Sequence, residues 1–290
     1  MSKNLPARLT VIRTEEVTRS MVRVVLGGEG FADYLQRDLS LPQVYTDKYV
    51  KLVFLADGYD YPEPLDLAVV KATMPQEAWP VLRTYTVSSV DEHDRELTID
   101  FVVHGDEGIA GPWAARAQPG DVIHLRGPNG GYAPDPSADW HLFVGDEAGL
   151  PAIAASLALL GPDERAVAFI EVGGPRDEVE LLTAADLELH WLHRGDAAPG
   201  STTLLDDAVR AWPWREGRAQ AFIHGESALL KSVRPYVLAD RGVDRADVSV
   251  SAYWRRGTTE EGFREWKSTQ NDAVMRPGPQ GPVADGNLVG

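Results

Sequence analysis

The first half of the chain alternates branched apolar residues with polar ones, which is the pattern of antiparallel β-strands. The segment LTVIRTEEVTRSMVRVVLGG predicts two strands on either side of a turn at TEEVT, ending at Gly27-Gly28. Four more strands are predicted at YVKLVFLA (49–56), RTYTVSSV (83–90), ELTIDFVVH (96–104) and DVIHLRGP (121–128), with a short helix in GPWAARAQPGD before the last of them. Six strands joined by short polar turns indicate a small antiparallel β-barrel or sandwich.

From residue 140 the pattern changes to strands that are apolar on both faces and alternate with helices. Strand patterns occur in WHLFVG, RAVAFIEVGG, LELHWLHRG, AQAFIHGES and DVSVSAYW, and helix patterns in LPAIAASLALLG, STTLLDDAVRAWPW and ALLKSVRPYVLADRG. This alternation predicts a parallel sheet covered on both sides. The proline-rich segment PDPSAD marks the boundary, so we predict a β-barrel domain at 1–134, an α/β domain at 139–268 and a disordered tail at 269–290, where Gly and Pro are frequent.

Composition narrows the class of protein. The chain has 290 residues, enough for two domains, and contains no apolar run of the length of a membrane span. Its N-terminus lacks the apolar core of a signal peptide, so we expect a soluble, cytoplasmic protein without membrane insertion. Cysteine is absent, and the seven histidines form no HxxxH or HxH spacing, so we expect no structural metal site.

Charge gives a further limit. Asp and Glu number 44 against 28 Lys and Arg, for a net charge of −16, which argues against a nucleic-acid or anionic-membrane surface. A local basic pocket in this acidic background would concentrate an anionic ligand. Nothing in the sequence indicates more than a monomer.

A series of short motifs follows in a fixed order. Arg83-x-Tyr85-Thr86 precedes His104-Gly105, Gly108-x-Ala110, Trp113-Ala114, PGD and GPNGGY, and the second half adds VGDEAGLPAI, HGES and SAYWRRGTTEEGF. Together these motifs resemble those of the siderophore-interacting proteins, ferric-siderophore reductases within the ferredoxin–NADP reductase superfamily, over residues from about 8 to about 267. The resemblance implies FAD on the barrel and a nicotinamide dinucleotide at the carboxyl edge of the parallel sheet.

The FAD contacts implied by the resemblance are Arg83, Thr84, Tyr85, Thr86, Asp100, Val102, His104, Gly108, Ala110, Gly111, Trp113 and Ala114. An arginine can bind a pyrophosphate bidentately, and backbone amides of the glycine loop and of the helix start at Trp113 can add donors. Tyr85 would cover one face of the isoalloxazine, and Thr86 would reach its N5 and O4 edge. Alone, RxYT is typical of an ordinary amphipathic strand, and His104 of a strand-end histidine bonded to backbone.

For NAD(P)H the resemblance implies Gly145, Asp146, Glu147, Gly225 and Glu226. The turn after the first apolar strand is not the GxGxxG dinucleotide fingerprint. It also departs from the family, which has Thr-Ala where this chain has Ala148-Gly149. No arginine pair is placed to bind a 2′-phosphate, so NADH, NADPH and ferredoxin all stay open as electron donors.

The cations implied to bind an anionic ferric siderophore are Lys48, Lys51, Arg255, Arg256 and Lys267. The alternative is that each balances nearby acids at the surface. The predicted activity is reduction of siderophore-bound Fe(III) by FAD and NAD(P)H, with no acid–base catalyst. The alternatives are a general NAD(P)H- or ferredoxin-linked flavin reductase of the same fold and a non-catalytic siderophore-binding protein.

Overall fold

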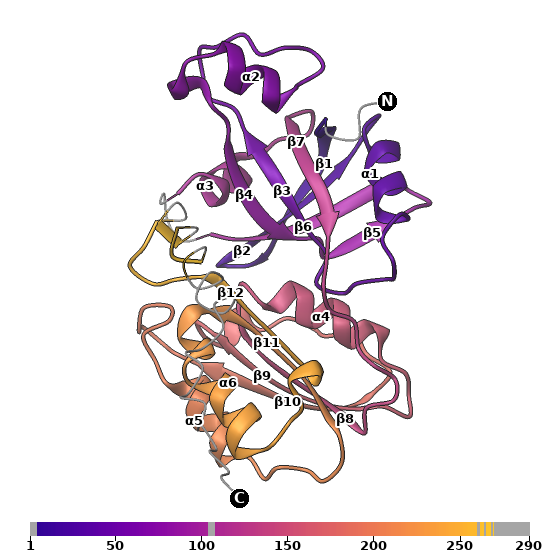
Figure 1. Cartoon of the computed structure of the whole chain (residues 1–290), viewed down its shortest axis with the longest axis vertical. Helices are drawn as coiled ribbons and strands as arrows, with labels where there is room; N and C mark the ends of the chain where they lie inside the picture. Colours follow the sequence, from indigo (N-terminus) through magenta and orange to yellow (C-terminus); the bar gives the residue numbers. More distant parts are fainter. Residues whose placement is uncertain (1–4, 104–107, 260–261, 264, 268, 270–290) are drawn as a thin grey trace, which may run out of the picture. The chain divides into compact units, whose positions relative to one another are not determined.

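Antiparallel strand pairing organises the N-terminal half of the chain. The computed structural model describes residues 5–103, 108–259, 262–263, 265–267 and 269. Seven strands form one sheet in the order β4-β3-β7-β1-β2-β6-β5, with every neighbouring pair antiparallel (Figure 1). They are β1 (Ala7–Thr18), β2 (Met21–Gly27), β3 (Tyr49–Phe54), β4 (Val81–Thr86), β5 (Ser89–Asp91), β6 (Glu96–Val102) and β7 (Val122–Asn129).

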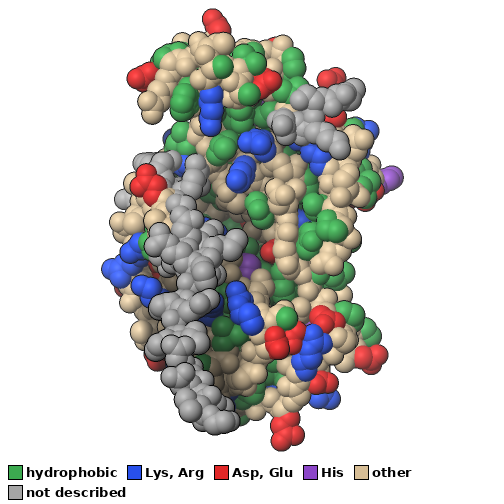
Figure 2. Space-filling model, viewed as in Figure 1, with side chains coloured by type: hydrophobic (Ala, Val, Ile, Leu, Met, Phe, Trp, Pro, Cys, Tyr) green, Lys and Arg blue, Asp and Glu red, His purple; other side chains and the backbone are tan. Residues whose placement is uncertain are grey.

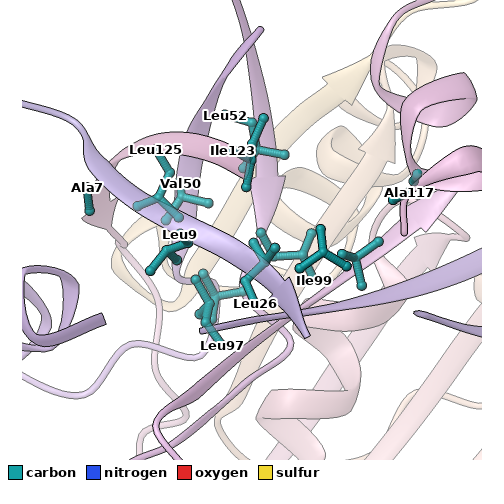
Figure 3. Packing of buried hydrophobic residues seen from close by; sticks show 14 of the residues in the cluster. Ala7, Leu9, Leu26, Val50, Leu52, Leu97, Ile99, Ala117, Ile123 and Leu125 are labelled. Atoms are coloured by element: carbon teal, nitrogen blue, oxygen red, sulfur yellow. The ribbon is translucent and has the colours of Figure 1, made fainter. Parts of the chain in front are cut away.

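Every second residue of these strands points into one apolar core. Leu9 of β1, Leu52 of β3 and Leu125 of β7 are fully buried and pack together in this cluster (Figure 3). This is the two-residue period from which the strands were predicted. The two ends of the sheet also meet, because the Tyr85 ring of β4 lies 4.4 Å from the Phe101 ring of β6. The sheet is therefore curled into an open barrel, with β4 as its first strand.

Two details of the predicted strands are wrong. The first turn lies at Arg19-Ser20, and β1 continues through the segment TEEVT. The segment RTYTVSSV contains two strands, because the chain changes partners at Val87: the Val87 amide donates to Lys48, on the β3 side, whereas the Ser88 amide donates to Thr98 of β6. Consequently β4 pairs with β3, and the hairpin consists of β5 and β6.

Helices interrupt the strands of the barrel at several places. The predicted α3 (Ala110–Arg116) is confirmed, whereas α1 (Phe31–Asp38), α2 (Leu67–Thr73) and the 3-10 turn η1 (Gln76–Ala78) were not predicted. Asp66 caps α2 by accepting from the Ala68 amide at 2.8 Å. Val70 of α2 packs with Leu65 on Val53, on the outer face of β3. The α2 segment therefore covers one end of the outer barrel face.

The second half forms a parallel sheet, as predicted, and its five strands lie in the order β10-β9-β8-β11-β12 (Figure 1). One buried cluster joins this sheet to α4 on one face, and another joins it to α5 and α6 on the opposite face. The strands are β8 (Trp140–Asp146), β9 (Arg165–Val172), β10 (Asp186–His193), β11 (Ala219–Glu226) and β12 (Val248–Trp254). The helices are α4 (Leu150–Leu159), α5 (Leu204–Ala211) and α6 (Val233–Pro235), with short turns η2 (Pro175–Asp177), η3 (Ser227–Leu230), η4 (Tyr236–Asp240) and η5 (Arg245–Asp247).

One predicted helix is irregular. The segment ALLKSVRPYVLADRG forms the 3-10 turn η3, the short α6 and the π-helical turn η4 instead of one continuous α-helix. Pro235 lies in its middle and lacks the backbone N–H that a continuous helix would use there. The irregular path still buries Val233 and Val237 against the sheet.

The chain divides into two compact units, Met1–Arg256 and Gly257–Gly290. Within the first unit, hydrogen bonds join the barrel half to the α/β half: Ser156 Oγ of α4 donates to Thr46 Oγ1 at 2.8 Å and Ser20 Oγ to Asp177 Oδ1 of η2 at 2.9 Å. The predicted domain boundary near residues 134–139 stays a prediction. The predicted disordered tail lies outside the described residues except for Thr269.

Candidate functional site

Arg83 and Tyr85 lie on the inner side of β4, at the end of the sheet. Strand pairing places them opposite Leu52 and Val50, whose side chains face the barrel core. The Arg83 side chain is buried, with the residue 6% exposed, and its Nη1 donates to the Leu82 carbonyl at 3.1 Å. The protein thus holds a guanidinium group inside the barrel wall next to an aromatic ring.

An aromatic cluster surrounds this position. The Phe101 ring lies 4.4 Å from Tyr85 and 5.6 Å from Trp113, and Trp113 lies 5.8 Å from Phe54. Trp113 belongs to α3, which lies directly on β6: a Cβ atom at Gly111 would come within 3.3 Å of the Val102 carbonyl. The fold therefore brings together five of the residues that the sequence assigned to FAD, namely Arg83, Tyr85, Val102, Gly111 and Trp113.

Other residues assigned to FAD have side chains engaged elsewhere. Asp100 accepts from Arg23 Nε at 2.7 Å and from Ser88 Oγ at 2.9 Å. Ala110 and Ala114 are buried in the barrel core, so only their backbone could meet a ligand. Thr84 is exposed on the outer face of β4. Gly108 has a φ of +79°, which favours glycine, whereas His104 lies outside the described residues.

Beside Thr86 lies a partly buried hydrogen-bonded chain that the sequence did not predict. The Thr86 side chain is close enough to the Tyr253 phenol of β12 to interact with it. Tyr253 Oη lies 3.0 Å from Nδ1 of His224, and Nε2 of His224 lies 2.9 Å from Ser249 Oγ. Burial raises the pKa of Tyr253, so the phenol stays neutral. HGES and SAYW were the relevant sequence signals, but they do not reveal that these segments meet.

The glycines of the two predicted nucleotide turns are required by packing. A Cβ atom would lie 2.7 Å from the His224 carbonyl oxygen at Gly145 and 2.4 Å from it at Gly149. Gly225 has a φ of +154°, and a Cβ there would meet the Asp146 carboxylate at 2.9 Å. The departure from the family at Ala148-Gly149 therefore lets the β8–α4 turn press against β11.

Asp146 joins the carboxyl ends of three strands. Its Oδ2 accepts from the Glu226 amide at 2.9 Å and from Trp254 Nε1 at 2.7 Å, and its Oδ1 accepts from the Ala148 amide at 2.9 Å. Burial, followed by the nearby Glu147 carboxylate, raises the pKa of Asp146 to about 6. This carboxyl group therefore binds a proton close to neutral pH.

The neighbouring carboxylates are also bonded within the protein. Glu147 Oε1 lies 2.6 Å from Arg194 Nη1 in a buried ion pair that lacks hydrogen-bond alignment. Glu171 accepts from Thr202 Oγ1 at 2.6 Å, and burial raises its pKa. Glu226 accepts from Ser227 Oγ and from the Arg256 amide. The predicted NAD(P)H residues thus lie together at the carboxyl edge of the sheet, with their charged groups already bonded.

The predicted substrate cations are distributed over several elements. Lys48 Nζ forms an ion pair with Asp38 at 2.8 Å, whereas Lys51 is exposed on the outer face of β3. Arg255 is half-buried and Arg256 exposed just after β12. Lys267 belongs to the second unit, where its Nζ lies 5.8 Å from the Phe263 ring centroid.

The residues at the open edge of the barrel fit FAD. A buried guanidinium suits a pyrophosphate, aromatic rings suit the planar isoalloxazine, and a positive-φ glycine permits a loop to approach a ligand closely. Within the described ranges, no cluster of potential ligands could hold a metal ion. No described helix is long and apolar enough to cross a membrane.

Comparison with protein families matches both halves of the chain. Residues 10–132 match the siderophore-interacting FAD-binding domain, and residues 138–257 match the siderophore-interacting protein model. An uncharacterized Mycobacterium tuberculosis protein is 47% identical, covering 91% of this chain and 95% of that protein. A ferric vibriobactin reductase of Vibrio cholerae is 30% identical (90% and 93%), as is an NADPH-dependent ferric-chelate reductase of Escherichia coli (85% and 91%).

Solved structures show the same architecture. A siderophore utilization protein from T. fusca is 36% identical, with a TM-score of 0.73 over 88% of this chain and 94% of that one. A ferredoxin–NADP+ reductase from Plasmodium falciparum, at 11% identity, has a TM-score of 0.59 over 86% of this chain and 96% of its own. The second likeness shows the fold alone, which is that of the ferredoxin reductases.

Proposed function

Because the chain belongs to the siderophore-interacting protein family, we propose that it is a ferric-siderophore reductase that uses FAD to pass electrons from NAD(P)H to Fe(III). The observation that supports this most is the arrangement around β4. Arg83 and the aromatic cluster lie on its inner side, and the exposed Lys51 lies on the outer face of the adjoining strand. A cofactor on one side of the strand and an anionic substrate on the other would be separated by little more than its thickness.

In this proposal FAD is held mainly by the barrel. Arg83 binds the pyrophosphate, and Tyr85 covers the isoalloxazine. Thr86 follows Tyr85 directly on β4, and its backbone amide would face the flavin edge. His104 and Gly108 complete the phosphate side of the site.

Bound FAD would supply the redox chemistry, taking a hydride from NAD(P)H and giving single electrons to two Fe(III) centres in turn. The chain's own residues bind, orient and exclude water. Lys51, Arg255 and Arg256 would hold the anionic ferric chelate. The hard oxygen ligands of the chelate bind Fe(II) more weakly than Fe(III), so reduced iron would be released to the cytoplasm.

The nicotinamide dinucleotide would bind at the carboxyl edge of the parallel sheet, beside Gly145 and Gly225. This is where ligands bind in open α/β sheets. Because Asp146, Glu147 and Glu226 are bonded within the protein, backbone groups of the two turns would make most contacts. The Escherichia coli relative uses NADPH according to its name, and we propose NADH or NADPH for this chain.

An anaerobic reoxidation experiment tests the proposal. The purified flavoprotein is reduced with NADH or NADPH and mixed with ferric siderophores while an Fe(II) chelator reports product. We expect the flavin absorbance to return with formation of two Fe(II) per flavin. If no ferric siderophore reoxidises the protein faster than it reoxidises free FMN, the reductase function is wrong.

Two controls separate the alternative functions. A general flavin reductase would reduce free flavin or an artificial acceptor at a rate that does not change when Lys51 or Arg255 is substituted. A non-catalytic siderophore-binding protein would be purified without the yellow colour of FAD and would bind the ferric chelate without turnover.

A further inference from the structure

Three side chains form a row across the outer face of the barrel. Lys51 of β3 pairs in register with Arg126 of β7 on one side and with Thr84 of β4 on the other. All three are exposed, whereas Leu52 and Leu125, the next residue on each of two strands, point into the core. Two cations thus stand directly opposite each other in an antiparallel ladder, where cross-strand Cβ atoms are about 5 Å apart.

Neither cation forms an ion pair within the part of the chain that the structure describes. Among the residues that the structure describes, neither Lys51 nor Arg126 has an ion pair or a side-chain hydrogen bond. Glu63 interacts electrostatically with His124 of β7, and Asp47 accepts from the Gly131 and Tyr132 amides. Like charges placed opposite each other repel, so an anion bound between the two cations would relieve this repulsion.

The row is also bordered on both sides. Two residues along β3 in one direction, Val53 lies under the α2 segment with Leu65 and Val70. Two residues in the other direction, Tyr49 pairs with Thr86, whose side chain is close to Tyr253 of β12. The open strip between these borders is about 14 Å long, from the rise per residue of a strand. Figure 2 shows Lys and Arg side chains gathered on this face, below the α2 segment at the top of the view.

A bulge in β7 fixes the direction of Arg126. The register with β3 shifts between Tyr49 and Lys51, and Gly127, directly after Arg126, has a φ of +112°. A Cβ atom at Gly127 would lie 3.2 Å from the Tyr49 carbonyl. Bulges of this kind re-aim a side chain and occur often beside functional sites.

We propose that Arg126 and Lys51 form the floor of an anion site that selects ferric siderophores of net negative charge, with Arg126 as its specificity-determining residue. The inference rests on the proposed function and names its substrate class. A tris-catecholate complex of a trivalent metal carries three negative charges, whereas a tris-hydroxamate complex is neutral. Two adjacent cations in a bordered strip favour the first by direct attraction, which salt screens.

Binding of gallium complexes tests this selection without electron transfer, since Ga(III) has the charge of Fe(III) but is not reduced. The oxidised flavoprotein is titrated by calorimetry with a trianionic Ga(III) tris-catecholate and with a neutral Ga(III) tris-hydroxamate. For Arg126→Gln we expect about tenfold weaker binding of the trianionic complex and less than about twofold change for the neutral one. Arg126→Lys should recover most of the lost affinity. In 0.5 M salt, most of the difference in affinity between the trianionic and the neutral complex should disappear.

Arg165→Gln is the matched control, because Arg165 is an exposed arginine at the first residue of β9 and its loss changes the net charge equally. Equal weakening by Arg126→Gln and Arg165→Gln would show a general charge effect and overturn the inference. So would equal weakening of both complexes by Arg126→Gln, or an effect of that variant only on the binding of an acidic ferredoxin.

The reoxidation experiment keeps this inference separate from the proposed function. If ferric siderophores reoxidise the wild-type protein but Arg126→Gln binds and reacts as the wild type does, the inference fails and the reductase function stands. If no ferric siderophore reoxidises the wild type, the function itself fails.

Discussion

The two sheets hold their predicted ligand-binding residues in opposite ways. At the carboxyl edge of the parallel sheet, Asp146, Glu147 and Glu226 are buried and bonded to other protein groups. On the barrel, Tyr85 is half-buried at the end strand, and Lys51 is exposed without an ion pair to any described residue. We infer that the barrel binds ligands with side chains, whereas side chains of the parallel sheet chiefly maintain its shape.

The largest expected effect is on FAD binding by the barrel. Substitution Arg83→Ala removes a buried guanidinium from the open edge, and we expect FAD to bind about 300-fold more weakly, or about 3.4 kcal/mol. Titration of the FAD-free protein by visible absorbance measures this. Arg83→Lys should recover part of the affinity but not the bidentate contact. An affinity within twofold of wild type in Arg83→Ala would contradict the role of Arg83.

The parallel sheet should respond to pH through Asp146. Its pKa is about 6 in the folded protein and about 3.9 when unfolded, so its stabilising contribution is full below pH 4 and is lost as pH rises through 6. The loss is about 3 kcal/mol. The free energy of unfolding in urea is measured for the wild type and for Asp146→Asn from pH 4 to 7.5. The difference between the two proteins should change by this amount over that pH range. A difference independent of pH would exclude proton binding by Asp146.

The link between the two sheets gives a smaller effect. Tyr253→Phe removes the hydroxyl that bonds to His224 and lies beside Thr86, and we expect the free energy of unfolding to fall by about 2 kcal/mol. Urea unfolding measures it. Tyr59→Phe is the control, since Tyr59 is exposed and its hydroxyl has no bond to a described residue, and it should match wild type. Equal stability of both variants would mean that the buried chain contributes nothing.

The smallest effect is expected at Lys48. Because Lys48 pairs with Asp38, we expect Lys48→Gln to change stability by less than about 1 kcal/mol and chelate affinity by less than about twofold. Calorimetric titration with the trianionic gallium complex provides the comparison with Lys51→Gln. A larger loss of affinity for Lys48→Gln would place Lys48 in the substrate site and extend the proposed anion site beyond Lys51 and Arg126.

Local patterns predicted the elements well because their causes are local. Strand β3 was predicted from Val50, Leu52 and Phe54, which occupy every second position and all face one core. The segment 83–90 was predicted as one strand, whereas the chain changes partners at Val87 and forms the two strands β4 and β5. The α2 helix was missed because only Val70 of it is buried, so its apolar pattern is weak.

The site was predicted in part for a similar reason. Arg83 and Tyr85 were found because they occupy one motif on one strand. The placement of Thr86 beside Tyr253 and His224 could not be predicted, since it depends on which strands meet across more than a hundred residues of sequence. Arg126 was missed for the same reason, because its position beside Lys51 follows from a register and a bulge.

The aromatic cluster at the open edge of the barrel also has an optical consequence. Tyr and Trp rings in contact with an excited isoalloxazine donate an electron to it and quench its emission. If FAD lies against Tyr85, near Phe101 and Trp113, the bound cofactor will be almost dark, and in turn it will quench the indole of Trp113. Release of the cofactor would then increase the fluorescence of both the flavin and the Trp113 indole, so loss of FAD could be followed without an added label.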